Sequence, residues 1–320
     1  MLVFTHKNHL KFGWGDGVYN FDNKDQQLWI DFGQAEYIPT SFKDECLRTA
    51  KLIGEAADKP ILLFLSGGVD SEVTARSFIE AGIPFEVATA NIIHNGKIIN
   101  EHDTMYAASF IKKFNLKVHT VNINFIELAN RYKQIRETKN PAEPYYKVSM
   151  GFLNQIMMFE KFCENYFCIT GNGDVVISPH RSYNQSDNIQ YGLYAGRSFS
   201  CSALAAYELS ARKSINVARF FCYTPELLLA WILDPDIQHW IKYEKALMGP
   251  HGWMNIHTIK SFVLYKIWPD MEVRPKLIGF ENIPEYSELY VSDFYNDDKS
   301  YMKIPIDTLL TMLLPKESTT

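Results

Sequence analysis

A short apolar run that leads through two glycines into a helix pattern constrains this chain more than any other feature. Residues Ile61 to Leu65 are all apolar, residues Ser66 to Ser71 read Ser-Gly-Gly-Val-Asp-Ser, and residues 72–80 have a helical pattern. A helix that follows a buried strand and a glycine turn presents unpaired amides at its N-terminus, where the helix dipole favours an anion. The stretch therefore predicts an anion site at the end of a strand.

The side chains around the glycines narrow the kind of anion. Ser66 and Ser71 add hydroxyl donors, and the carboxylate of Asp70 would repel a bare phosphate unless a cation lay between them. We therefore expect a polyphosphate that is bound together with Mg²⁺. The alternative is an ordinary tight turn between a core strand and a helix. No Gly-Lys-Ser or Gly-Lys-Thr follows the glycines, so the loop is not a Walker A motif.

Strands and helices alternate along the chain on both sides of this loop. The patterns predict strands at 60–65, 84–92, 117–123 and 166–170, and helices at 41–57, 72–81, 101–114 and 145–165. Ser41 or Thr40 is expected to cap the first helix, and Met105, Ala108 and Ile111 are expected to point inward from the third. The alternation predicts a Rossmann-like α/β fold, with a parallel sheet, helices on both of its faces and ligands at the carboxyl ends of the strands.

The two ends of the chain differ from this central part. Residues 1–40 are expected to be a short β-rich segment, with a hairpin turn at Asp16-Gly17 between Phe12–Trp14 and Val18–Tyr19. Residues 41–198 are expected to form the α/β domain that carries the loop. Residues 199–320 are expected to be a mostly helical region that closes the site, with helices at 200–215, 224–233 and 257–268.

Composition excludes several classes of function. Of the 320 residues 47% are apolar, enough for a large core, and the net charge of −5 without a basic run does not favour a nucleic-acid substrate. We expect no membrane helix and no secretory signal, and hence a cytoplasmic protein. The cysteines are scattered without a Cys-x-x-Cys motif and are expected to be reduced thiols rather than metal ligands. They are Cys46, Cys163, Cys168, Cys201 and Cys222.

The string from Ser66 to Ser71 resembles the pyrophosphatase loop (PP-loop) of ATP pyrophosphatases, the superfamily of asparagine, GMP and NAD synthetases and several tRNA-modifying enzymes. In that superfamily the loop holds the β,γ-pyrophosphate of ATP while a substrate attacks the α-phosphate. The chain is most similar to the synthetase domain of asparagine synthetase, because six stretches between residues 41 and 285 follow that family's order. They are the helix 41–57, the loop 66–71, and residues 101–119, 169–174, 221–228 and 273–280.

This resemblance implies that the ligands are ATP and Mg²⁺, and it implies a role for each matching residue. Asp70 and Asp174 would bind Mg²⁺, and Lys276 would neutralise the charge that grows on the α-phosphate and the leaving pyrophosphate. These three would be the catalytic residues. The nucleotide would be held by the loop and by the backbone at neighbouring strand ends. The expected set is Leu65, Ser66, Gly67, Gly68, Val69, Asp70, Ser71, Ala90, Thr170 and Gly171.

Several of these residues, and some others with reactive side chains, have a plainer explanation. Asp174 could be a turn acid, and Lys276 a solvated surface lysine. Glu101 and Asp103 are expected to cap a helix rather than to touch a ligand. His94, His119 and His180 are expected to be surface or core histidines, and Arg181 is a candidate cation on the substrate side.

The chain also departs from the family pattern. Position 2 is Leu2 instead of the family's cysteine, so we expect no glutamine hydrolysis here and an amine from free ammonia, another subunit or an amine substrate. Asn172 stands where the family has glutamate, which argues against aspartate as the substrate. We expect a ligase that adenylates a carboxylate, or an amide or carbonyl oxygen, for displacement by an amine. The alternatives are a nucleobase- or tRNA-modifying enzyme and a non-catalytic nucleotide-binding subunit.

Overall fold

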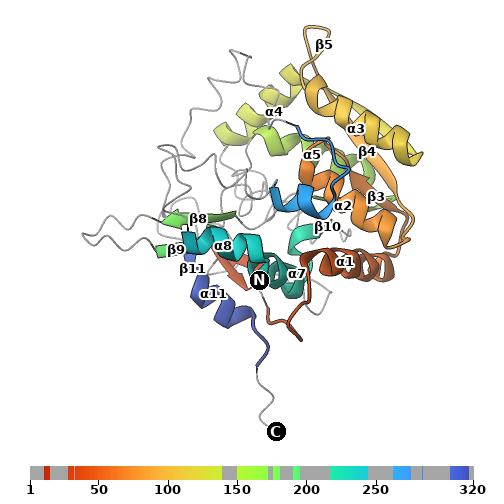
Figure 1. Ribbon diagram of the computed structural model, residues 1–320. Coiled ribbons are helices and arrows are strands. Elements are labelled where there is room, and N and C mark those ends of the chain that lie inside the picture. Colours follow the sequence, from red (N-terminus) through yellow and green to blue (C-terminus); the bar gives the residue numbers. More distant parts are fainter. Residues whose placement is uncertain are drawn as a thin grey trace.

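The structure is a computed structural model (Figure 1). It describes residues 11–14, 28–31, 33–138, 150–171, 176–180, 190–194, 217–243, 262–274, 283 and 303–316. Within these residues a central sheet is packed between two layers of helices, and a small antiparallel sheet lies to one side of it (Figure 1).

Six strands form the central sheet, and all but β5 run parallel. The parallel strands stand in the order β6 (Val118–Asn124), β4 (Glu86–His94), β3 (Ile61–Phe64), β7 (Phe167–Thr170) and β10 (Val217–Arg219). The short β5 (Lys97–Ile98) turns back on the end of β4. From β3 the chain moves outward through β4 to β6, and it then returns to build β7 and β10 on the other side. This is a Rossmann-like order, and its topological switch point lies between β3 and β7.

Helices cover both faces of this sheet, as predicted. Because successive side chains of a strand point to opposite faces, Leu62 and Phe64 belong to one core cluster and Leu63 and Leu65 to the other. The first cluster is closed by α4 (Phe125–Thr138) and α5 (Met150–Phe162). The second is closed by α1 (Phe42–Ala56), α2 (Val69–Glu80), α3 (Glu101–Phe114), α7 (Pro225–Leu233) and the helical residues 262–267.

Local chemistry sets several helix ends. The side chain of Ser41 accepts a hydrogen bond from the amide of Asp44 at 3.1 Å and caps α1 as predicted. Helix α2 ends before Gly82, which has a φ of +71°, a backbone conformation that glycine adopts without strain. Asn95 and Gly96, with φ of +49° and +75°, form the turn between β4 and β5. The turn residues thus had a readable signal in the sequence.

The prediction for the inward face of α3 is wrong. Met105 is 57% exposed and Ala108 is also exposed, whereas Ala107 and Phe110 are buried in the core. Only Ile111 of the predicted face packs against the core, and it is partly buried. The helix is rotated toward Phe110 because an aromatic ring removes more apolar area from water than alanine does.

A second sheet and further helices follow the parallel strands. The sheet is antiparallel, in the order β11 (Lys303–Pro305), β9 (Gln190–Tyr194) and β8 (Val176–His180). The additional helices are the 3₁₀ helix η2 (Phe220–Cys222), α8 (Pro235–Tyr243) and α11 (Ile306–Leu313). Within residues 199–320, which were expected to be mostly helical, the described residues contain α7, α8 and α11 as well as the strands β10 and β11, and β11 pairs with β9. Pairing between strands so far apart in the chain cannot be predicted from a local sequence pattern.

The N-terminal strand pair differs from the predicted hairpin. Strand β1 (Lys11–Trp14) pairs antiparallel with β2 (Leu28–Asp31), and Asp16-Gly17 and Val18–Tyr19 lie outside the described residues. The following segment meets the C-terminal helix, because the amide of Ala35 donates to the carbonyl of Leu313 at 2.9 Å. Segments from the two ends of the chain are thus joined on the same side of the fold.

Two further expectations concern the chain as a whole. The predicted helix at 200–215 lies outside the described residues, and the division at residues 40 and 198 stays a prediction. Strand β10 comes from beyond residue 198 and completes the central sheet. Among the helices that the structure describes, none has the length and apolar character needed to span a bilayer.

Candidate functional site

The glycine loop lies at the switch point of the sheet, directly after β3. Its hydroxyls bond within the loop: Ser66 Oγ accepts from the amide of Gly68 at 3.3 Å, and Ser71 Oγ donates to the carbonyl of Gly68 at 2.9 Å. The two hydroxyl oxygens are 3.2 Å apart. Gly68 is the N-cap of α2 and has no side chain to accept from the first-turn amides. These amides have no acceptor within the helix, so the loop keeps donors for an anion.

Two glycines allow close backbone contacts on either side of the loop. Gly67 has a φ of +91°, and a Cβ there would lie 1.9 Å from the carbonyl oxygen of Asp103, at the start of α3. Gly171, directly after β7, would bring a Cβ within 2.8 Å of the backbone of Asp70 and Ser71. Both approaches exclude any side chain, because real Cβ atoms do not come that close to backbone. The loop is therefore held between α3 and the end of β7.

The structure brings most of the predicted nucleotide-binding residues to one edge of the sheet. Leu65 follows β3, Ala90 lies in β4, and Thr170 and Gly171 end β7. The amide of Leu65 donates to Ala88, and the carbonyl of Ala90 accepts from the side chain of Asn100 at 2.8 Å. Their predicted contacts with a nucleotide stay predictions. Asp174 and Lys276, as well as Asn172 and Arg181, lie outside the described residues.

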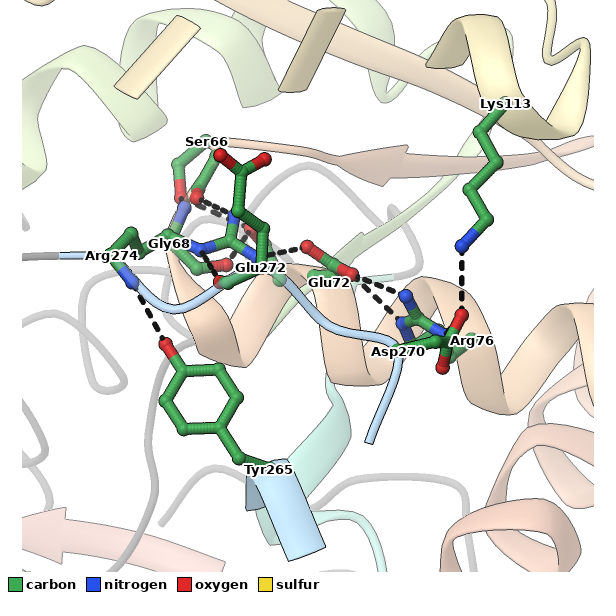
Figure 2. Close-up of polar contacts among 11 residues, drawn as sticks. Ser66, Gly68, Glu72, Arg76, Lys113, Tyr265, Asp270, Glu272 and Arg274 are labelled. Carbon is green, nitrogen blue, oxygen red and sulfur yellow. Dashed lines mark hydrogen bonds and ion pairs between the residues drawn. The ribbon is translucent and has the colours of Figure 1, made fainter. Parts of the chain in front are cut away.

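A segment from the C-terminal part of the chain lies along α2. We call residues 268–274 the strap. Its side chains meet three residues of α2 that are four positions apart and therefore share one side of the helix. The pairs are Trp268 with Glu80 (2.5 Å), Asp270 with Arg76 (2.8 Å) and Arg274 with Glu72. The strap thus follows α2 from its C-terminal end to the glycine loop, and Figure 2 shows the part nearest the loop.

Arg274 ends the strap beneath the loop (Figure 2). Its Nη1 donates to the carbonyl of Gly67 at 2.5 Å, and its Nη2 donates to the carboxylate of Glu72. Its guanidinium lies 4.7 Å from the ring centroid of Tyr106. The side chains of Arg274 and Glu72 are only 3% and 6% exposed. Because a buried charge is tolerated only when it is paired, Arg274 and Glu72 form one unit with the loop.

The sequence predicted a role for Lys276 but none for the nearby Arg274, and it predicted Glu72 only as an ordinary helix residue. A signal was present in the spacing of charges on α2. Glu72, Arg76 and Glu80 recur every fourth residue in a helix that is otherwise small or apolar. In a buried helix such a stripe requires a polar partner from elsewhere in the chain. The identity of that partner had no signal in the local pattern.

The acids and histidines singled out from the sequence stand mostly apart from the loop. Glu101 and Asp103 belong to the first turn of α3, where acids are favoured by the helix dipole. His94 packs edge-on against Phe125, with ring centroids 5.0 Å apart. His119 lies 2.6 Å from Glu86, at the amino end of β4. The side chain of His180 lies outside the described residues.

The described cysteines fit the expectation of core thiols. Cys46, Cys163 and Cys168 are buried and are not in disulfides. Burial raises the pKa of both the Cys46 and the Cys168 thiols, so they stay protonated at neutral pH. The side chains of Cys201 and Cys222 lie outside the described residues.

Comparisons with known proteins give only distant structural similarity. No protein-family model and no curated protein matches the sequence. NMN synthetase from Francisella tularensis is 17% identical over 42% of this chain and 56% of its own, with a TM-score of 0.31. NH3-dependent NAD synthetase from Campylobacter jejuni is 14% identical over 74% of this chain and 100% of its own, with a TM-score of 0.33. U34-tRNA thiolase NcsA from Methanococcus maripaludis is 16% identical over 79% and 81%, with a TM-score of 0.34.

Proposed function

We propose that this chain binds ATP with Mg²⁺ and cleaves it between the α- and β-phosphates, as an AMP-forming ligase. The observation that carries the proposal is the position of the loop from Ser66 to Ser71, at the switch point between β3 and β7. In open α/β sheets the crevice at this point is where ligands bind. The resemblance of the same six residues to a PP-loop supports ATP as that ligand.

The residues of the loop fit the two terminal phosphates. The bare backbone at Gly67 and the first-turn amides of α2 offer donors. The amide of Gly68 and the hydroxyls of Ser66 and Ser71 would add donors by exchanging their contacts within the loop for the anion. Asp70, in the first turn of α2, offers a carboxylate for Mg²⁺. This donor set suits a metal-bound pyrophosphate better than it suits a metal-free anion.

Lys276 is proposed to serve the same loop. It follows Arg274 by two residues, and Arg274 contacts the carbonyl of Gly67. Its ammonium is proposed to act at the phosphate site. There it would stabilise the charge that grows on the leaving pyrophosphate. Asp174, which follows β7 by four residues, is proposed as the second Mg²⁺ carboxylate.

The proposed reaction has two steps. A substrate carboxylate oxygen attacks the α-phosphorus, the bond to the β-phosphate breaks, and an acyl-AMP and pyrophosphate form. An amine nitrogen then attacks the acyl carbon, loses a proton, and AMP leaves with the electrons of the broken C–O bond. An amide or carbonyl oxygen could take the place of the carboxylate in the first step.

The test follows the fate of ATP. The protein with Mg-ATP and a pool of small carboxylates and amines is expected to release AMP and pyrophosphate, and to exchange labelled pyrophosphate into ATP when a suitable carboxylate is present. Asp70→Asn is expected to abolish both signals, whereas Asp58→Asn, an acid after the end of α1, should leave them unchanged. Release of ADP and phosphate would contradict the proposal, because it would mean attack at the γ-phosphate.

One observation favours a second candidate, a nucleotide-binding subunit without catalysis. Asn172 replaces the glutamate that the asparagine synthetase family has in its second glycine loop. For this candidate, Mg-ATP would raise the melting temperature without any turnover, and Asp70→Asn would leave that rise unchanged.

A further inference from the structure

The buried pair of Arg274 and Glu72 raises a question that the proposed function does not answer. Glu72 stands in the first turn of α2, close to the end of the helix where the terminal phosphates are proposed to bind. Its side chain is 6% exposed, so little water screens its charge. A bare carboxylate in this place would repel a polyphosphate. Some group must neutralise it before the loop can take an anion.

Two arginines do so from opposite sides. Arg76, one turn further along α2, donates to Glu72 Oε1 at 2.8 Å, and Arg274 of the strap donates to Glu72 Oε2. Arg76 is itself shared, because it also donates to both oxygens of Asp270 at 2.8 and 3.0 Å. Arg274, in contrast, pairs with Glu72 as the one carboxylate among its described contacts (Figure 2).

The second contact of Arg274 acts on the shape of the loop. Its Nη1 holds the carbonyl of Gly67 at 2.5 Å. A carbonyl oxygen carries partial negative charge, and one that turned toward the phosphates would oppose their binding. Because the guanidinium is a planar fork, it binds this carbonyl and the carboxylate of Glu72 at once. Tyr106 on one side and the backbone of the strap on the other keep the fork in place.

We propose that Arg274 is a positioning residue that sets the affinity of the loop for polyphosphate. It neutralises Glu72 and keeps the carbonyl of Gly67 away from the anion site. This inference rests on the proposed function, because it assumes that the loop binds the terminal phosphates. It adds that the strap, a segment distant in sequence, must be docked on α2 for the loop to bind them.

The test measures binding of Mg-pyrophosphate and of Mg-ATP to the full chain by calorimetry. Arg274→Gln is expected to weaken both by at least about tenfold, since one charge-assisted contact of a buried group is lost. The double variant Arg274→Gln with Glu72→Gln is expected to recover most of that loss, because it also removes the carboxylate that the shared Arg76 alone would have to neutralise. The matched control is Lys117→Gln, which removes an exposed cation from Glu86 at the amino end of β4 and should leave both affinities unchanged.

The rescue separates charge neutralisation from a merely structural role. If Arg274→Gln binds as tightly as the wild type, or if the double variant stays as weak as the single one, the proposal is wrong. Hydrogen exchange without nucleotide gives a second measurement. The amides of residues 66–71 are expected to exchange faster in Arg274→Gln than in Lys117→Gln, and equal rates would overturn the role in holding the loop. A wild-type chain that binds neither ligand would refute the proposed function, and the exchange rates would still test Arg274.

Discussion

At the scale of single residues, two glycines and one arginine decide the geometry of the loop. Gly67 and Gly171 are required because backbone lies where their side chains would be. Arg274 is required because Glu72 is buried and charged. The glycines are visible in the sequence as part of a motif, and their reason is visible only in the neighbours that touch them.

Replacing Gly67 with alanine tests this reason. Gly67→Ala is expected to lower the free energy of unfolding by about 3 kcal/mol or more, because a positive φ and a clash with the carbonyl of Asp103 act together. It is also expected to abolish binding of Mg-pyrophosphate. Gly82→Ala is the matched control, since Gly82 has a similar φ of +71° but open space around its Cα.

Gly82→Ala should cost only about 1 kcal/mol and should leave binding intact. Urea unfolding and calorimetry measure the two effects. Equal losses of stability in both variants would mean that the backbone conformation alone, and not the contact with Asp103, makes glycine necessary at position 67.

At the scale of elements, the strap and α2 are held together by paired charges. Asp270 accepts from Lys113 of α3 at 2.7 Å as well as from Arg76 of α2. The hydrogen bond from Lys113, together with that from Arg76 and against the effect of partial burial, lowers the pKa of Asp270 to about 2. One aspartate thus ties the strap to two helices.

This lowered pKa predicts how the stability depends on pH. The pKa of Asp270 falls on folding, so its contribution is fully present above the ordinary value of 3.8 and is lost as the pH falls toward about 2. Asp270→Asn should therefore lower the free energy of unfolding at pH 7, by under about 1 kcal/mol because the side chain is 56% exposed. The difference from the wild type should shrink as urea unfolding is repeated from pH 5 to pH 3. A difference that stays constant over this range would contradict the assignment.

Helix caps give a second prediction at this scale. Thr224 accepts from the amide of Leu227 at 3.1 Å and is fully buried, whereas Ser41 caps α1 at an exposed position. Thr224→Ala is expected to lower the free energy of unfolding by about 2 kcal/mol, and Ser41→Ala by about 1 kcal/mol or less. Thermal unfolding of the two variants checks the order. The reverse order would show that burial does not strengthen the cap.

At the scale of the whole molecule, the chain ends close the fold. Besides the contact of Ala35 with Leu313, the side-chain amide of Gln34 donates to the carbonyl of Leu314 at 2.8 Å. Helix α11 adds Leu309 and Leu313, both fully buried, to the core cluster that also contains α1, α2 and α7. The layer of helices beneath the loop therefore includes residues from both ends of the chain.

This arrangement predicts that α11 matters for global stability. Leu313→Ala is expected to lower the free energy of unfolding by about 3 kcal/mol, because it opens a cavity in the core. Met312→Ala is the matched control: its side chain is 38% exposed, so the change should cost less than about 1 kcal/mol. Equal effects in chemical unfolding would mean that α11 is not part of the cooperative core.

The sequence by itself was sufficient for the parallel strands β3, β4, β6 and β7, for the helices α1, α2, α3 and α5, and for a glycine loop between β3 and α2, but it did not predict α4. These features are encoded locally: apolar runs, helix periodicity, caps and glycine turns act within a few residues. The inward face of α3 was predicted wrongly because the local pattern of that helix is ambiguous. Several faces of that helix carry apolar residues, and only packing selects the one with Phe110.

Only the tertiary structure decided what surrounds the loop. The strap along α2, the pairing of Arg274 with Glu72, the join of Ala35 to Leu313 and the pairing of β9 with β11 all connect segments far apart in the chain. Such contacts have no period and no spacing in the sequence, because they arise when separately formed elements bury their remaining charges and apolar surface against each other. The glycine loop is therefore encoded in six consecutive residues, whereas the charge that pairs with Glu72 beside it comes from an arginine about two hundred residues away.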